Sequence, residues 1–116
     1  MRVAVNTIDE NGMQLWTLED IAGYKDYYKH LEAELFDVVM VEYKGHNLSV
    51  FIDDEGLYKA DNFGRNVAGY DSPLFGHLVV TGDVDAEGET LALPTELSLI
   101  DMMDFSSEVM YKTKGD

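Results

Sequence analysis

Residues 36–53 have the sequence FDVVMVEYKGHNLSVFID, and this stretch decides the fold. Its first part, Phe36 to Tyr43, is a dense apolar run that contains three valines, and Leu48 to Asp53 is a second such run. The polar residues 44–47, with a glycine at position 45, separate the two runs and are typical of a turn. Since β-branched and aromatic residues favour strands, we predict a β-hairpin of strands 36–43 and 48–53.

Other segments predict further strands around this hairpin. Residues 2–8 are rich in β-branched side chains, and the turn signal at 9–12 leads into the apolar residues 13–16, which predicts a second hairpin. Residues 75–82 predict a strand in the middle of the sheet, and residues 91–93 predict a short one. The Asn- and Gly-containing residues 62–73 predict a long loop.

Two helices are predicted. Apolar residues recur near a period of 3.6 after Thr17, a good N-cap, so we expect a helix over 18–34. Thr95 follows a proline and is the expected N-cap of a helix over 96–111. Strands and helices without regular βαβ alternation indicate an α+β domain over residues 1–116, with a largely antiparallel β-sheet and two helices packed on one face.

The composition favours a cytoplasmic protein with a hydrophobic core. Of the 116 residues, 46% are hydrophobic, which is enough for a core without disulfide or metal staples. The absence of cysteine excludes disulfides and thiol nucleophiles and is consistent with a reducing compartment. We expect neither secretion nor membrane insertion, because the sequence has no signal-peptide apolar region and no apolar run of 18 residues.

The net charge is the outlier of the composition. Against 8 Lys and Arg stand 23 Asp and Glu, which gives a formal net charge of -15. Such a surface repels nucleic-acid phosphates and anionic lipids and attracts basic proteins. We therefore expect a basic protein partner, with no direct binding to nucleic acid or membrane. Solubility alone is an equally good explanation of the total charge.

The distribution of charge is more informative than its sum. Residues 66–111 contain no Lys or Arg but nine carboxylates. Eight of them form the predicted partner-binding set, which comprises Asp83, Asp85, Glu87, Glu89, Glu96, Asp101, Asp104 and Glu108. Tyr24 and Tyr27 on the first predicted helix join the set as aromatic anchors, although core packing is the alternative role for them.

No motif indicates catalysis or a cofactor. Residues 83–89 resemble the first half of an EF-hand loop, but Pro94 stands where the closing Glu of that loop should be, so a solvated turn is the better interpretation. The three histidines lack zinc-site spacing, and no nucleophile elbow, phosphate-binding loop or dinucleotide fingerprint is present. We therefore predict a protein that is not an enzyme and that has no catalytic residue, metal or cofactor.

The hairpin 36–53, the turn 54–57, the segment 62–66 and the strand 75–82 follow one another in an order that resembles a family of small proteins. This family, numbered 3846, is catalogued as a domain of unknown function and is common in phages and mobile elements. The resemblance covers residues 31–94, and the first hairpin and the last helix depart from its pattern. It implies no activity, but it implies a phage or mobile-element origin, a context in which small acidic proteins inhibit host defence enzymes.

Two functions remain open from the sequence. The first is an inhibitor in the cytoplasm of a bacterial host, for example of the anti-CRISPR type. Its carboxylates would imitate nucleic-acid phosphates in the basic groove of a nucleic-acid-handling protein. The second is a small-molecule or nucleotide-sequestering module, in which Lys59, Arg65 and Asn66 would form a local positive pocket. The oligomeric state is not predicted.

Overall fold

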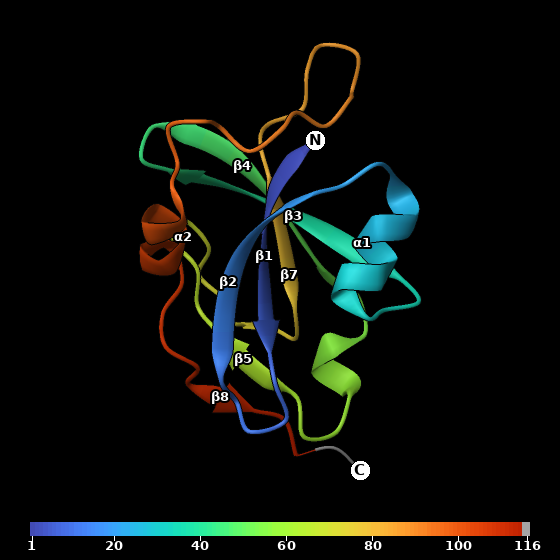
Figure 1. Ribbon diagram of the computed structural model, residues 1–116. Helices are drawn as coiled ribbons and strands as arrows, with labels where there is room; N and C mark the ends of the chain where they lie inside the picture. The colour runs from blue at the N-terminus through green and yellow to red at the C-terminus, as the bar shows by residue number, and fades with distance from the viewer. Residues whose placement is uncertain (115–116) are drawn as a thin grey trace.

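A computed structural model describes residues 1–114 and shows an α+β fold built on antiparallel sheets, as the sequence predicts (Figure 1). The main sheet has five strands in the order β2-β1-β7-β4-β3. These are β1 (Arg2–Ile8), β2 (Gln14–Asp20), β3 (Phe36–Tyr43), β4 (His46–Asp53) and β7 (Leu78–Thr81). A second sheet of order β6-β5-β8 contains β5 (Phe63–Arg65), β6 (Leu74–Phe75) and β8 (Tyr111–Lys112). The helices are α1 (Tyr24–Leu31), the 3-10 turn η1 (Gly56–Tyr58) and α2 (Leu99–Phe105).

Both predicted hairpins are present. β3 and β4 pair without interruption from Phe36–Asp53 to Tyr43–His46. The turn between them is tighter than predicted, because Lys44 and Gly45 both adopt positive φ angles, as two-residue hairpin turns require. β4 therefore begins at His46 rather than at residue 48. The predicted strand at 75–82 is central, since β7 lies between β1 and β4.

The first helix is shorter than the predicted 18–34. Residues 17–20 continue β2 instead, with Leu18 paired to Ala4 and Asp20 to Arg2, so Thr17 is not an N-cap. Pairing along the whole of β1 satisfies more backbone groups than an early helix start would. The helix begins after Gly23, and the Asp26 carboxylate accepts a hydrogen bond from the Ala22 amide before the first turn.

The second helix is also shorter than the predicted 96–111. Ser98, not Thr95, is its N-cap, through a capping box with Asp101. The helix ends at Phe105 because the following residues bond in an extended conformation along β5, with Ser107 N–H donating to Asn66 O and Met110 N–H donating to Gly64 O. The predicted long loop at 62–73 thus contains β5. Residues 91–93 form no strand: Leu91 bonds to Gly82 and Asp83 at the foot of a loop, and Leu93 N–H donates to Arg2 O.

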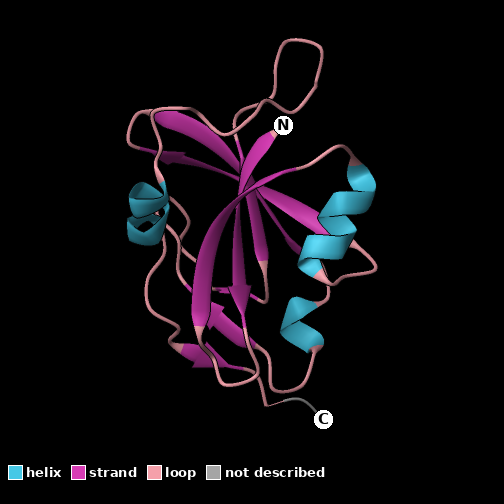
Figure 2. Ribbon diagram, in the orientation of Figure 1, coloured by secondary structure: helices cyan, strands magenta, loops and turns pink. Residues whose placement is uncertain are grey.

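The two helices cover opposite faces of the main sheet, not one face (Figure 2). On one face, Val5 and Val79 pack with Tyr27 and Leu31 of α1. The other face packs against α2, the second sheet and the segments around them. Its buried residues include Ala4, Val50, Leu78, Val80, Val67, Leu93, Met102 and Phe105. The helices lie on opposite faces because a sheet with apolar side chains on both faces needs a cover on each.

Candidate functional site

The acidic residues 83–89 lie in a loop that projects from one end of the main sheet, beyond the start of β1 (Figure 1). The loop is a closed turn, since Val84 pairs with Thr90 and the Asp85 N–H donates to Glu89 O at 2.8 Å. Asp85 Oδ1 accepts hydrogen bonds from the amides of Glu87 and Glu89, both at 2.9 Å. Asp85 therefore holds the loop together, while the side chains of Glu87 and Glu89 are exposed to solvent.

The foot of this loop is fixed to the sheet. Gly82 N–H donates to Leu91 O at 2.9 Å, and a Cβ atom at Gly82 would lie 2.3 Å from Ala92 O, so only glycine fits there. Asn47 in β4 donates to Asp83 Oδ2 at 3.4 Å. The loop is thus a positioned element, and its carboxylates have a defined place at this end of the molecule.

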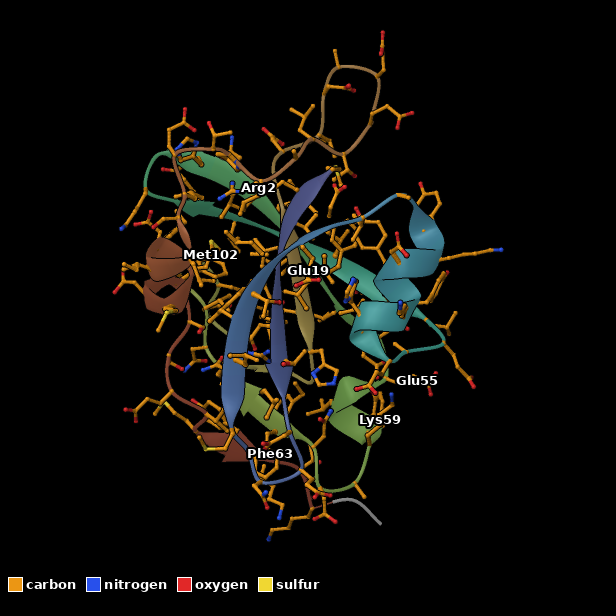
Figure 3. The ribbon with its side chains drawn as sticks, viewed as in Figure 1. Arg2, Glu19, Glu55, Lys59, Phe63 and Met102 are labelled. Atoms are coloured by element: carbon orange, nitrogen blue, oxygen red, sulfur yellow. The ribbon has the colours of Figure 1, made fainter. Side chains whose placement is uncertain are left out.

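Arg2 ties the next segment to the start of β1 (Figure 3). Its guanidinium donates to Pro94 O at 2.9 Å and to Leu97 O at 2.7 Å, and its backbone oxygen accepts from Leu93 N–H. Because these acceptors are carbonyls, the cation of Arg2 orders the approach to α2 without pairing with the exposed carboxylate of Glu96.

Asp101 and Asp104 on α2 are joined to the β3–β4 turn. Lys44 Nζ lies 2.6 Å from Asp101 Oδ1, and Tyr43 Oη donates to Asp101 O at 2.7 Å and to Asp104 Oδ2 at 3.0 Å. The bond from Lys44, followed by the bonds from Ser98, lowers the pKa of Asp101 to about 2. Burial and the bond to Asp104 raise the pKa of Tyr43. These two carboxylates therefore help to attach α2 to the sheet.

The outer side of α2 carries apolar side chains that the predicted set omitted. Met102 and Phe105 are buried against the sheet, whereas Ile100 and Met103 are 77% and 59% exposed. Ile100 lies one helical turn before the exposed Asp104. The sequence contains the signal for this surface, because residues 99, 100, 102 and 103 are apolar and cannot all face one core.

The structure gathers part of the predicted set and disperses the rest. We use the name acidic end for the loop residues 83–89 together with Glu96 and Asp104. Two of its carboxylates bond to opposite strands of the same hairpin, Asp104 to Tyr43 of β3 and Asp83 to Asn47 of β4. Glu108 lies apart from it, in the segment after α2, where Ser107 N–H donates to Asn66 O and Met110 N–H donates to Gly64 O of β5. Among residues 1–114, the acidic end has no ion pair to Lys or Arg.

The two predicted tyrosines have different environments. Tyr24 is 74% exposed and lines a shallow hollow of about 190 Å³ together with Gly88 and Glu89, so the structure brings it next to the loop. Tyr27 is buried, and its ring stacks on Phe51 at a centroid distance of 4.4 Å. Burial raises the pKa of the Tyr27 hydroxyl. Tyr27 thus has the packing role that was the alternative in the sequence analysis.

A second group of polar side chains lines a cleft between α1, η1 and the start of β7. His77 Nδ1 accepts a hydrogen bond from Ile8 N–H at 3.0 Å, so its ring proton lies on Nε2, which contacts Glu32. Asp53 pairs with Lys59, which extends from the segment after η1 (Figure 3), and accepts from Glu55 N–H. Because these groups satisfy one another, the cluster fastens η1 and α1 to the sheet and presents no free nucleophile or base.

The residues suggested for an anion pocket are not open to solvent together. Arg65 is fully buried and donates to Leu74 O, Gly76 O and Asn6 Oδ1. Lys59 pairs with Asp53. With these bonds in place, Arg65 and Lys59 do not form the local positive pocket that the nucleotide-sequestering alternative requires.

Comparison with known proteins identifies a family and no characterised relative. The family model described as a domain of unknown function (DUF3846) matches residues 3–106. The match includes the first hairpin and α2, which we expected to depart from the family pattern, so that expectation is wrong. Neither the curated proteins nor the solved structures contain a significant match. None of the helices within residues 1–114 is long and apolar enough to cross a membrane.

Proposed function

Since this chain belongs to the DUF3846 family, whose description assigns no activity, we propose its function from the acidic end. We propose that it is a non-enzymatic protein that binds a basic partner. The observation that carries the proposal is that α2 has exposed apolar and acidic side chains and that the loop at 83–89 has further exposed carboxylates. Ile100, Met103 and Asp104 are exposed on α2, and Glu87 and Glu89 are exposed on the loop. Protein interfaces combine apolar anchors, methionine among them, with a polar rim.

Charge supports the choice of partner. Two cations bonded to α2 and to the segment before it are engaged, Lys44 with Asp101 and Arg2 with backbone carbonyls. The exposed carboxylates of Glu87, Glu89 and Glu96 are therefore available to the guanidinium and ammonium groups of a partner. Complementary charge raises the association rate and excludes partners of the wrong sign.

The proposed partner is a nucleic-acid-handling protein whose basic groove receives these carboxylates in place of phosphates. B-DNA presents about one negative charge per 1.7 Å of helix axis, so a mimic needs several carboxylates on a positioned element. The bonds of Asp85 to two loop amides provide such positioning. We also propose the biological setting, which is the cytoplasm of a bacterial host in which a phage or mobile element uses this protein against a defence enzyme.

The test is capture of partners from bacterial lysate at low salt and their elution at high salt, followed by affinity measurement with the purified partner. The variant Glu87→Lys with Glu89→Lys should weaken binding by roughly tenfold or more, since each lost charge contact at a close interface costs on the order of 1 kcal/mol. The variant Ile100→Ala with Met103→Ala should weaken it without changing the salt dependence. Glu10→Lys with Glu34→Lys is the matched control, because both side chains are exposed and the net charge changes equally.

Two results would overturn the proposal. Binding that is insensitive to salt, or that tolerates both test variants as well as the control variant, would exclude the acidic end as the interface. If the partner bound its nucleic acid equally well in the presence of saturating protein, imitation of phosphates would be wrong.

A further inference from the structure

β3 is an edge strand of the main sheet, and its outer side has no strand beside it. All eight of its residues pair with β4 on the inner side. The strand contains no Pro or Lys, which are residues that protect natural sheet edges from pairing with other chains. Within residues 1–114, no backbone hydrogen bond joins residues 36–43 to any segment other than β4.

The other edge strand, β2, packs on one face against the segment after α2. Gln14 donates to Ser107 O at 3.1 Å, and Trp16 Nε1 donates to Ser106 Oγ at 3.0 Å. β3 has a comparable neighbour only near its end, where Gly69 approaches Glu42 so closely that a Cβ atom would lie 2.8 Å from Glu42 O. The free part of the edge is therefore Phe36 to Met40.

The Asp37 side chain shows that the backbone N–H of Val38 is not bonded to β4. Val38 N–H donates to Asp37 Oδ1 at 2.8 Å rather than to β4. Because the backbone groups of alternate residues in an antiparallel strand point to opposite sides, Phe36, Val38 and Met40 direct theirs away from β4. The Asp37 carboxylate thus occupies an amide that an added strand would bond, and it would become free for a cation once that strand was in place.

The side chains along this edge are apolar and the charges are acidic. Leu35, Val38 and Met40 are 55%, 42% and 49% exposed. Residues 30–43 contain four carboxylates and no Lys or Arg. A second copy of the chain is a poor occupant, because it would bring its own Asp37 and Glu42 into the ladder and its net charge is also -15.

We propose that the outer edge of β3, at Phe36 to Met40, binds an extended basic segment of a partner protein by β-strand addition. Backbone bonds to Phe36, Val38 and Met40 provide the pairing, and alternate apolar side chains of the segment cover Val38 and Met40. A Lys or Arg of the segment pairs with Asp37 when its carboxylate leaves the Val38 amide. This site is separate from the acidic end and does not depend on the function proposed for it.

The test uses an eight-residue peptide of alternating Lys and Val, a Glu and Val version, and a Lys and Val version with one central Pro. NMR of the full-length protein should show protection and chemical-shift changes at the amides of Phe36, Val38 and Met40 with the first peptide. The proline peptide has the same charge but cannot complete the ladder, so it should bind at least about tenfold more weakly. Equal binding of the two basic peptides would reduce the interaction to charge attraction and overturn the proposal.

Variants separate this edge from the rest of the surface. Val38→Lys should lower the affinity for the Lys and Val peptide by about tenfold, because like charges then face each other across the ladder. Leu15→Lys is the matched control on β2, where the side chain is 60% exposed, and it should change the affinity less than twofold. If Val38→Lys does not fold, Asp37→Asn should weaken binding of the basic peptide and leave the fold intact.

Three further outcomes decide the proposal. Unchanged affinity in both edge variants would overturn it, and so would preference for the Glu and Val peptide. Sedimentation that shows a dimer lost in Val38→Lys would assign the edge to a second copy instead of a basic segment. Since Glu87→Lys with Glu89→Lys lies outside this edge, it should lower the affinity for the Lys and Val peptide less than the two edge variants do.

Discussion

The guanidinium of Arg65 donates a hydrogen bond to the side-chain oxygen of Asn6, and both side chains are fully buried between the main sheet and the second sheet. The other acceptors of Arg65 are the carbonyls of Leu74 and Gly76. No carboxylate within residues 1–114 pairs with this cation, in a chain that carries 23 of them. Burial lowers the pKa of Arg65 to about 9. The role of the Arg65 guanidinium is structural, because it donates hydrogen bonds to Leu74 of β6 and to Gly76 in the bend that follows.

Replacement of Arg65 with Met should therefore destabilise the protein strongly. The change leaves the Leu74 and Gly76 carbonyls and the Asn6 side chain without their donor, which should cost at least about 3 kcal/mol of unfolding free energy. Urea denaturation measures this, and Lys112→Met on the neighbouring β8 is the control, because Lys112 is exposed and should change stability by less than about 0.5 kcal/mol. A variant within 1 kcal/mol of the wild type would contradict a structural role for the Arg65 bonds.

The bond from Lys44 to Asp101, together with the capping box of α2, predicts a specific acid dependence. The pKa of Asp101 is about 2 in the folded protein against an ordinary value of 3.8, so the unfolded chain binds its proton more readily. The stabilisation from Asp101 is therefore fully present above pH 3.8 and is lost as the pH falls through about 2. The difference in melting temperature between wild type and Asp101→Asn should be constant above pH 4 and should shrink toward pH 2. A difference that grew on acidification would contradict this sign.

Much of the fold follows from local sequence patterns. The 36–53 hairpin, the first hairpin and the central strand at β7 have strong β-branched runs and turn residues, and all three are present. The short strands β5, β6 and β8 could not be predicted, because each has only two or three residues and the pairing of β5 with β8 joins distant parts of the sequence. The same dependence explains why residues 17–20 extend β2: their pairing with β1 outweighs a helical apolar period.

The position of the helices was open to a better prediction. Consecutive residues are buried in β1 from Val3 to Val5 and in β7 from Leu78 to Val80. Runs of this kind, rather than alternating ones, are typical of a sheet that is covered on both faces. They indicate that α1 and α2 lie on opposite faces. The apolar pattern of each helix alone does not show which face of the sheet it covers.

The candidate site was predictable in composition but not in space. The absence of Lys and Arg over residues 66–111 identifies the loop at 83–89, yet it cannot show that Asp101 pairs with Lys44 from another hairpin or that Glu108 lies beside β5. Asp85 and Asp104 belong to the predicted partner-binding set, and both accept hydrogen bonds within the chain. These bonds depend on tertiary contacts and local turn geometry, which cannot be predicted from the distribution of charged residues along the sequence.

Two adjacent methionines on α2 distinguish core from surface. Met102 is fully buried under the helix, whereas Met103 is mostly exposed beside Ile100. Met102→Ala should lower the free energy of unfolding by about 2–5 kcal/mol, because it removes a packed side chain and leaves a cavity. Met103→Ala should change it by less than about 0.5 kcal/mol. Thermal and urea unfolding of the pair provide the measurement.

The same pair also tests the proposed interface without a change of charge. Met103→Ala should weaken binding of the basic partner through lost apolar contact while stability stays at the wild-type value, and Leu57→Ala, an exposed apolar residue of η1, should have no effect on binding. If Met103→Ala bound as tightly as Leu57→Ala, the exposed side of α2 would not be part of the interface. The loop at 83–89 would then have to account for binding alone, with a correspondingly steeper dependence on salt.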